Sequence, residues 1–150
     1  MPEEALLCSS ISEIGVPIKV DIYDYLRDTI SKDNIIPIFM LSENYYKSLA
    51  CLNEMGAVWI TQKDYYIFLI PPFSFGDIGG AINLNKKGIR LECSNKNELY
   101  NLRDGLNQFR SQMESVFNLK KLKNWERKRD VFIEKIHLIY NREVNVTVPL

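Results

Sequence analysis

Residues 41–59 have the sequence LSENYYKSLACLNEMGAVW. Here the chain leaves an apolar run through a polar turn and enters a helical pattern, which we expect to span residues 46–61. On that helix the neighbours of Glu54 at helical spacing are small or apolar: Ala50, Cys51, Ala57 and Val58. A carboxylate in such surroundings loses hydration and favours a cationic or hydrogen-bonding partner, such as a substrate. The alternative is that Glu54 lies at the edge of the apolar stripe and reaches water.

Segments on both sides of this stretch alternate between strand and helix patterns. Apolar runs at residues 5–9, 35–41 and 65–70 predict buried strands, and residues 88–92 predict a short last strand. Because residues 35–41 are apolar throughout, we expect a parallel strand that is covered on both faces. Residues 20–30 show the spacing of one helix face. The alternation indicates an α/β layer fold with a mainly parallel sheet.

The C-terminal third predicts two amphipathic helices. Apolar residues recur at helical spacing from Leu99 to Val116, and a second pattern from Leu122 to Ile139 is interrupted by Arg129. Two short helices lack the heptads of a coiled coil, so we expect both to pack on the domain. The tail at residues 143–148, EVNVTV, alternates like a strand. We therefore expect a domain at residues 1–118, with a C-terminal helix and tail at residues 119–150 packed on it.

Composition excludes several classes of protein. The 150 residues suit one domain, and 19 basic against 19 acidic residues give no overall attraction to nucleic acid or an anionic membrane. The basic residues between Lys120 and Arg129 are better explained as a solvated helix face than as a nucleic-acid site. Three cysteines without metal-ligand spacing, and a single histidine, His137, argue against metal sites and histidine triads. With neither a membrane-spanning stretch nor a signal-peptide pattern, we expect a cytoplasmic protein.

Three segments, in this order, resemble a bacterial TIR (Toll/interleukin-1 receptor) domain, over about residues 2–106. CSSISEIGVPIKVDIYDYL is similar to the second strand, the loop after it and the second helix of that family. IIPIFMLSENYYKSLACLNEMGAVW is similar to the third strand and third helix, and YYIFLIPPFSFGDIGGAIN to the fourth strand and its loop. The resemblance implies a flavodoxin-like TIR fold.

Many bacterial TIR domains hydrolyse or cyclise NAD with a glutamate on the third helix, and the residue that matches it is Glu54. The resemblance therefore implies an NAD+ glycohydrolase that yields ADP-ribose or a cyclic ADP-ribose, with NAD+ as substrate and no other cofactor. It suggests a role in antiphage defence or signalling, with activity that depends on self-association. The alternative is a non-catalytic TIR module that acts through TIR–TIR contacts.

The resemblance also implies a substrate pocket around the catalytic Glu54. Its substrate-binding residues would be Ser10, Ile14, Gly15, Tyr45, Ser48 and Cys51. Tyr45 and its neighbour Tyr46 would stack on a base, but packing of both rings inside the domain explains them equally well. Cys51 is better explained as a small buried residue than as a nucleophile, because no histidine base lies near it in sequence.

The resemblance leaves the first strand and first helix of the family without a counterpart, so we expect an N-terminally truncated domain. In the flavodoxin-like strand order 2-1-3-4-5 that strand is central, and its loss would expose the edges of the strands at residues 5–9 and 35–41. Either these two strands pair directly, or a partner or another segment supplies a strand. The alternating tail with Val144, Val146 and Val148 is one candidate.

Overall fold

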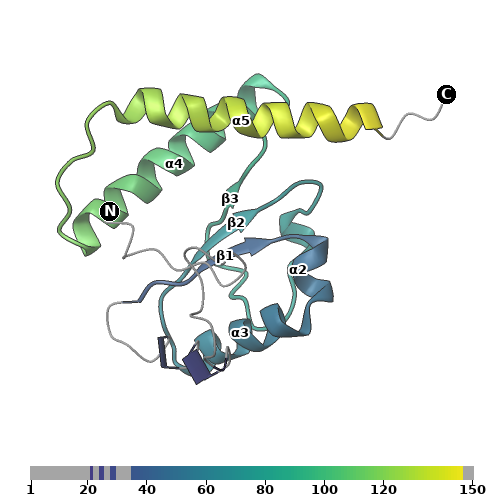
Figure 1. The fold of residues 1–150 in the computed structure, drawn as a ribbon, viewed down its shortest axis with the longest axis vertical. Coiled ribbons are helices and arrows are strands. Elements are labelled where there is room, and N and C mark those ends of the chain that lie inside the picture. The colour runs from purple at the N-terminus through teal and green to yellow at the C-terminus, as the bar shows by residue number, and fades with distance from the viewer. Residues whose placement is uncertain (1–20, 22–23, 26–27, 30–34, 147–150) are drawn as a thin grey trace.

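The computed structural model describes residues 21, 24–25, 28–29 and 35–146, with residues 140–146 as backbone alone. It is an α/β fold whose three-stranded parallel sheet lies between two helical layers (Figure 1). This arrangement is consistent with a flavodoxin-like layout, so the predicted fold class is confirmed at that level. Within the described part of the chain, no helix combines the length and hydropathy needed to cross a membrane.

The sheet follows chain order, β1-β2-β3. Strand β1 (Ile38–Leu41) pairs in parallel with β2 (Tyr66–Leu69), and β2 pairs in parallel with β3 (Ile89–Arg90). All three lie inside segments predicted as strands, and β2 ends just before the cis Pro71–Pro72 bond. Because the strands are parallel, their carboxyl ends meet at one edge of the sheet, which is where open α/β sheets place ligand sites.

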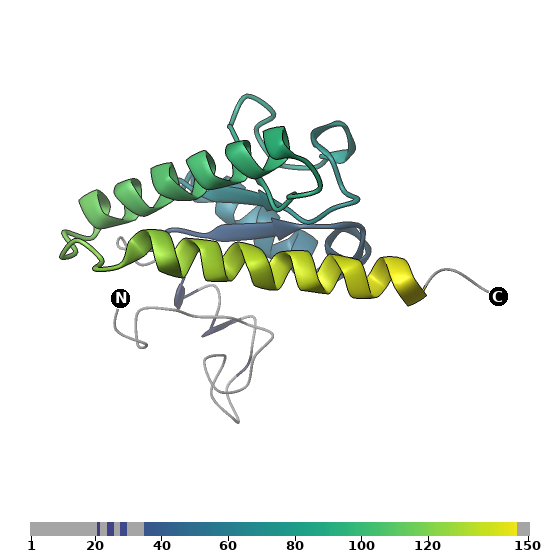
Figure 2. The ribbon, with the colours of Figure 1, turned by 90° about the horizontal axis from the view of Figure 1, so that it is seen from above.

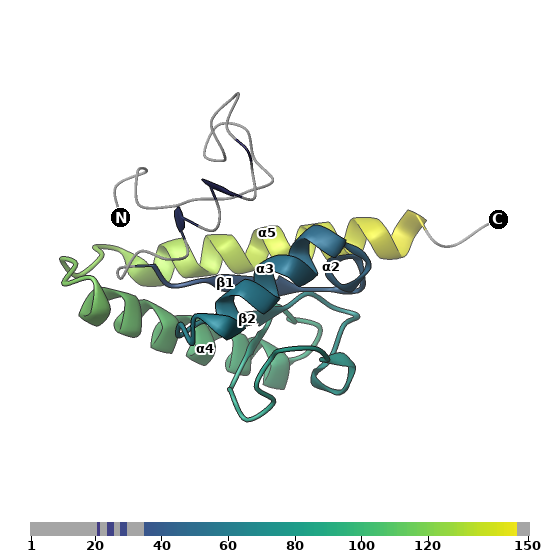
Figure 3. The same cartoon turned by 90° about the horizontal axis from the view of Figure 1, so that it is seen from below.

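The two faces of the sheet carry separate hydrophobic clusters. On one face, α2 (Glu43–Lys47) and α3 (Leu49–Ile60) lie over β1 and β2, and Figure 3 views the molecule from this side. This cluster contains Phe39, Leu41, Met55, Val58, Ile67, Leu69, Phe73 and Ile82. On the other face lie α4 (Lys96–Val116) and α5 (Trp125–Val146), nearest the viewer in Figure 2. The second cluster contains Phe68, Leu91, Leu102, Leu106, Ile133 and Ile136.

Strand β1 is buried on one face, although we expected it to be buried on both. Its burial alternates, with Phe39 and Leu41 buried while Ile38 and Met40 are exposed. We expected this apolar strand to be covered on both faces, but among the described residues only the face towards α3 is fully covered. No described strand pairs with the outer edge of β1.

The helix expected over residues 46–61 is interrupted at Ser48. This serine is the last cap of α2 and the first cap of α3, with an extended backbone at φ −94° and ψ 113°. Its hydroxyl accepts a hydrogen bond from the amide of Cys51 at 3.3 Å. Serine competes for backbone hydrogen bonds at helix starts, so the chain ends one helix and begins another there.

The C-terminal helices match the predicted pattern, but the tail does not. Helix α4 contains the predicted stripe, and Leu102, Leu106 and Met113 are its buried residues. The strand expected from residue 143 onwards is wrong as far as Val146, because α5 continues to that residue. A helical backbone cannot add a strand to the sheet, so residues 143–146 do not supply the strand that the family resemblance leaves without a counterpart. Residues 147–150 and the strand expected at residues 5–9 lie outside the described residues.

Candidate functional site

Glu54 lies in the middle of α3 and is half-buried. Helix α3 begins shortly after β1 ends, so its first turns lie near the carboxyl edge of the sheet. Burial raises the pKa of the Glu54 carboxyl. Among the described residues, no hydrogen-bond donor or cation contacts this carboxylate. Glu54 therefore has the unmatched, partly desolvated character that its neighbours in sequence predict.

Three predicted site residues contact one another at the junction of α2 and α3, before Glu54 in the chain. The hydroxyl of Tyr45 donates a 2.9 Å hydrogen bond to the carbonyl of Cys51, whose amide is capped by Ser48. Burial, followed by the charges of Cys51 and Glu54, raises the pKa of Tyr45. The structure therefore brings Tyr45, Ser48 and Cys51 together at the start of the helix that carries Glu54.

The tyrosine rings make the contacts expected of packing residues. The ring of Tyr45 meets Phe39 edge-on with centroids 6.2 Å apart, and Tyr46 stacks on Phe73 at 5.2 Å. The hydroxyl of Tyr46 donates to the carbonyl of Gly79 at 3.0 Å and accepts from its amide at 3.1 Å. These bonds fix the loop after β2 against α2. A stacking role on a substrate stays a prediction for both rings.

Three of the predicted site residues lie outside the described part of the chain, and Cys51 is less buried than expected. Ser10, Ile14 and Gly15, predicted to border the nucleotide, lie outside the described residues. Cys51, expected to be buried, is half-buried. Its backbone is held at both ends by Tyr45 and Ser48.

A surface hollow of about 530 Å³ lies at the other end of α3, and Glu54 does not line it. It is formed by Val58, Trp59, Gln62, Lys63, Asp64, Tyr65, Gly80, Ala81, Ile82, Asn83 and Lys86. Inside it, Lys86 forms an ion pair with Asp64 and lies 4.1 Å from the centre of the Tyr65 ring. The hollow borders the amino end of β2, whereas ligands in open α/β sheets bind at the carboxyl ends. We therefore do not assign it to the Glu54 site.

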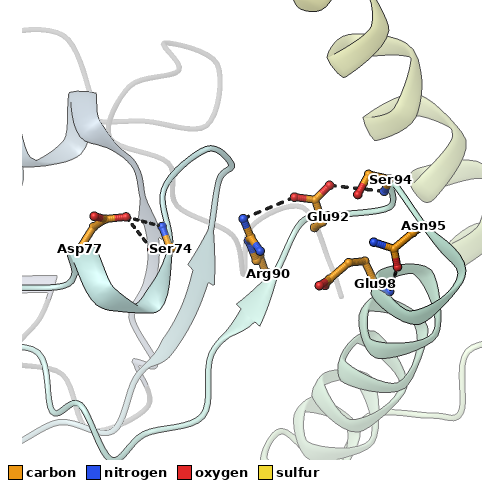
Figure 4. A network of polar contacts seen from close by, with 7 residues as sticks. All are labelled: Ser74, Asp77, Arg90, Glu92, Ser94, Asn95 and Glu98. Atoms are coloured by element: carbon orange, nitrogen blue, oxygen red, sulfur yellow. Dashed lines mark hydrogen bonds and ion pairs between the residues drawn. The ribbon is translucent and has the colours of Figure 1, made fainter.

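A polar network that sequence reasoning missed lies beyond the carboxyl end of β3 (Figure 4). Arg90 contacts Glu92 at 3.5 Å, and Glu92 accepts a hydrogen bond from the amide of Ser94 at 3.3 Å. On the other side of Arg90, Asp77 accepts hydrogen bonds from the amide and hydroxyl of Ser74 at 2.8 and 2.7 Å. The available signal was the presence of polar residues near the ends of two predicted parallel strands, with Ser74 and Asp77 after residues 65–70 and Glu92 at the end of residues 88–92. Its carboxylates outnumber its one cation, so the network does not favour an anionic ligand.

His137 lies on α5 and is exposed. Its Nδ1 lies 3.8 Å from the sulfur of Cys93, so the pair joins α5 to the segment before α4. Burial, and then the charge of Glu92, raises the pKa of the Cys93 thiol. Both effects disfavour a thiolate nucleophile. Over the described ranges, no three His, Cys, Asp or Glu side chains are grouped to hold a metal ion.

Comparison with known proteins identifies one relative of unknown activity. Over 101 residues the chain is 39% identical to the uncharacterized protein YddK of Bacillus subtilis (strain 168). The matched region is 67% of this chain and 36% of YddK, so the chain spans well under two thirds of that relative. No protein-family model matches the chain. No solved structure shows significant similarity to it.

Proposed function

We propose that the chain is a TIR-type NAD+ glycohydrolase whose catalytic residue is Glu54. The observation that carries the proposal is a half-buried carboxylate with a raised pKa and no partner in the described structure. It lies on α3, the second of the two helices between β1 and β2, in a parallel α/β fold compatible with a flavodoxin-like layout. Carboxylates that are desolvated without a compensating partner are enriched at functional sites.

One carboxylate is sufficient for this chemistry. The nicotinamide of NAD+ is cationic at the bond that breaks, so it leaves as a neutral molecule and needs no proton donor. The bond electrons go to the nicotinamide nitrogen, and positive charge develops on the ribosyl carbon and ring oxygen. Glu54 would stabilise that charge or hold the ribose hydroxyls in position. Water then adds to the ribosyl carbon and loses a proton, which gives ADP-ribose.

The residues around Glu54 supply the rest of the proposed site. Ser48 and Tyr45 hold the backbone at Cys51, which lies one turn before Glu54 on α3. Burial, followed by the charges of Cys51 and Glu54, raises the pKa of Tyr45, so the phenol stays protonated and keeps its hydrogen bond to the backbone. An intramolecular nucleophile in place of water would give a cyclic product from the same intermediate.

The test is NAD+ consumption by the purified full chain, with chromatographic separation of the products. Glu54→Gln keeps the shape of the side chain, and we expect it to lower turnover by about 100-fold or more. Glu43→Gln is the matched control, because Glu43 is an exposed residue in the same segment that pairs with Lys47. Retention of activity in the Glu54→Gln variant would contradict the proposed role. No turnover by folded wild-type protein at high concentration would favour the non-catalytic TIR module instead.

A further inference from the structure

Residues 117–131, which form the loop between α4 and α5 and the first turns of α5, carry a basic surface. Five of the nine residues from 120 to 128 are exposed cations: Lys120, Lys121, Lys123, Arg127 and Lys128. Glu126 is the one exposed acid in that range, so five positive charges against one negative leave a surplus of four. The sequence predicted a solvated helix face here, but the three lysines lie in the loop. The balance of 19 basic and 19 acidic residues in the whole chain therefore does not extend to this surface.

Helix α4 holds the loop in a defined shape. The amide of Leu119 donates to the carbonyl of Glu114 at 2.9 Å, and the amide of Leu122 donates to the carboxylate of Glu114 at 3.0 Å. The same carboxylate is paired with Arg110 at 3.6 Å, so its charge is balanced within α4. Both bonds to the loop use backbone amides and need none of the lysine side chains.

Apolar side chains lie among these cations. Leu122, between Lys121 and Lys123 in the chain, is 40% exposed, and Val131 on α5 is 43% exposed. A hollow of about 310 Å³ borders the loop at its last residue. It is formed by Asn124, Arg127, Lys128 and Val131, so two cations lie beside an aliphatic side chain there. The surface therefore offers both positive charge and apolar contact to a ligand.

We propose that this basic surface binds an anionic phospholipid layer. Clusters of about four to eight lysines or arginines attract anionic headgroups, and aliphatic side chains beside them enter the boundary between headgroups and acyl chains. In this arrangement the three lysines of the loop contact headgroup phosphates, and Leu122 enters the layer between them. Arg127 and Lys128 bind a further phosphate at the hollow.

The aromatic residues of this segment argue against a single-stranded nucleic acid as the partner. Proteins that bind such strands present exposed rings on which the bases stack. Here Phe117 and Trp125 are both half-buried. The indole of Trp125 donates to Asn107 at 2.6 Å, and Arg110 lies 5.5 Å from the centre of its ring. A duplex would bind the cations alone and gain nothing from the exposed part of Leu122.

The basic surface lies away from the carboxyl edge of the sheet. Helix α4 begins after the carboxyl end of β3 and runs back along the sheet, and the loop lies at its far end (Figures 1 and 2). A chain attached to a lipid layer through this loop therefore keeps the carboxyl edge, near which α3 begins, away from the layer. The inference does not depend on NAD+ cleavage.

The test is co-sedimentation of the full chain with phosphatidylcholine vesicles that contain either no phosphatidylglycerol or about 40% of it. We expect binding to the anionic vesicles alone, and at least about tenfold weaker binding when salt rises from roughly 0.05 to 0.5 M. The variant with Lys120→Gln, Lys121→Gln and Lys123→Gln should bind about 100-fold more weakly, because each lysine near such a surface contributes about fivefold. The matched control replaces the exposed Lys47, Lys87 and Lys96 by glutamine, and it should bind within about threefold of the wild type.

A second pair of variants tests the apolar contact. Leu122→Ser should weaken binding roughly five- to tenfold, whereas Leu84→Ser, at a 69% exposed position in the loop before β3, should leave it unchanged. The glutamine variants keep the backbone bonds that hold the loop, so they should fold like the wild type.

Three outcomes would overturn the proposal. The first is no binding of the wild type to the anionic vesicles at low salt. The second is an equal loss of binding in the triple loop variant and in its matched control. The third is tighter binding of duplex DNA than of the vesicles at the same salt concentration, which would identify a nucleic acid as the partner.

Discussion

Partial burial makes Glu54 a candidate for a catalytic role. Its pKa is raised in the folded chain because part of its hydration is lost without a compensating partner among the described residues. Raising the folded pKa above the unfolded value means that the folded state binds the proton more tightly. The contribution of Glu54 to stability is therefore most favourable at acidic pH and declines as pH rises through the folded pKa.

The upward shift of the Glu54 pKa on folding predicts how Glu54→Gln changes stability. The amide cannot ionise, so the variant should be more stable than the wild type at neutral pH, and the difference should vanish below about pH 4. The measurement is the thermal midpoint of both proteins across this pH range. Glu43→Gln, which removes an exposed carboxylate, is the control for a general change in net charge. A Glu54→Gln variant that is less stable than the wild type at pH 7 would show that a partner stabilises the carboxylate.

At the scale of the element, Ser48 determines where α3 begins. Its hydroxyl accepts the hydrogen bond from the Cys51 amide that would otherwise be lost at the start of the helix. We expect Ser48→Ala to lower the free energy of unfolding by about 0.5–2 kcal/mol. Urea denaturation measures the change, with Ser111→Ala on the exposed face of α4 as control. Equal stability of both variants would mean that the cap contributes nothing, and that residues 43–60 tolerate a continuous helix.

Two glycines inside helices should respond to alanine in opposite directions. A Cβ at Gly56 in α3 meets nothing within 4 Å, so Gly56→Ala should gain about 0.5–1 kcal/mol from helix propensity. A Cβ at Gly105 in α4 would lie 3.1 Å from Cγ1 of Ile89, where α4 approaches β3. Overpacking there costs about 1–3 kcal/mol, which offsets or exceeds the propensity gain. Urea denaturation compares the free energy of unfolding of the two variants. If Gly105→Ala is as stable as Gly56→Ala, the Ile89 side chain moves aside at no cost in stability.

Sequence reasoning located the elements whose apolar pattern was strong and missed those decided by tertiary context. The unbroken apolar run at residues 65–70 gave β2, and the regular stripe of α4 gave its buried face. The break at Ser48 was missed because the apolar spacing continues across it, while a single side-chain hydrogen bond ends the helix. The tail was missed because period-two alternation over a few residues is weak beside the extension of a long helix.

Some features of the candidate site could be predicted from the sequence, and others depend on tertiary contacts. The position of Glu54 among small and apolar neighbours, with Cys51 one turn before it, could be predicted from helical spacing alone. The contacts of Tyr45 with Phe39 and with the Cys51 carbonyl depend on how α2 turns against β1. No local pattern encodes that turn. By contrast, the ion pair of Arg90 with Glu92 and the hydrogen bonds of Asp77 with Ser74 join residues only two and three apart.

At the scale of the whole molecule, both hydrophobic clusters depend on one strand. Ile67 and Leu69 of β2 belong to the cluster under α3, while Phe68 between them belongs to the cluster under α4 and α5. Loss of either helical layer would expose one face of the same strand. We therefore expect the described chain to unfold in a single transition, with α5 included, rather than losing α5 first.

Truncations in the two clusters test this coupling. Leu69→Ala and Ile133→Ala should each cost about 2–5 kcal/mol and shift one common transition, because both side chains are buried in clusters that share β2. Trp125, whose indole donates a 2.6 Å hydrogen bond to Asn107 of α4, reports on the contact between α5 and α4. In a Trp59→Phe background it is the single remaining tryptophan. Its fluorescence should then change together with far-ultraviolet circular dichroism in urea. An earlier change in fluorescence would mean that α5 detaches from a domain that remains folded without it.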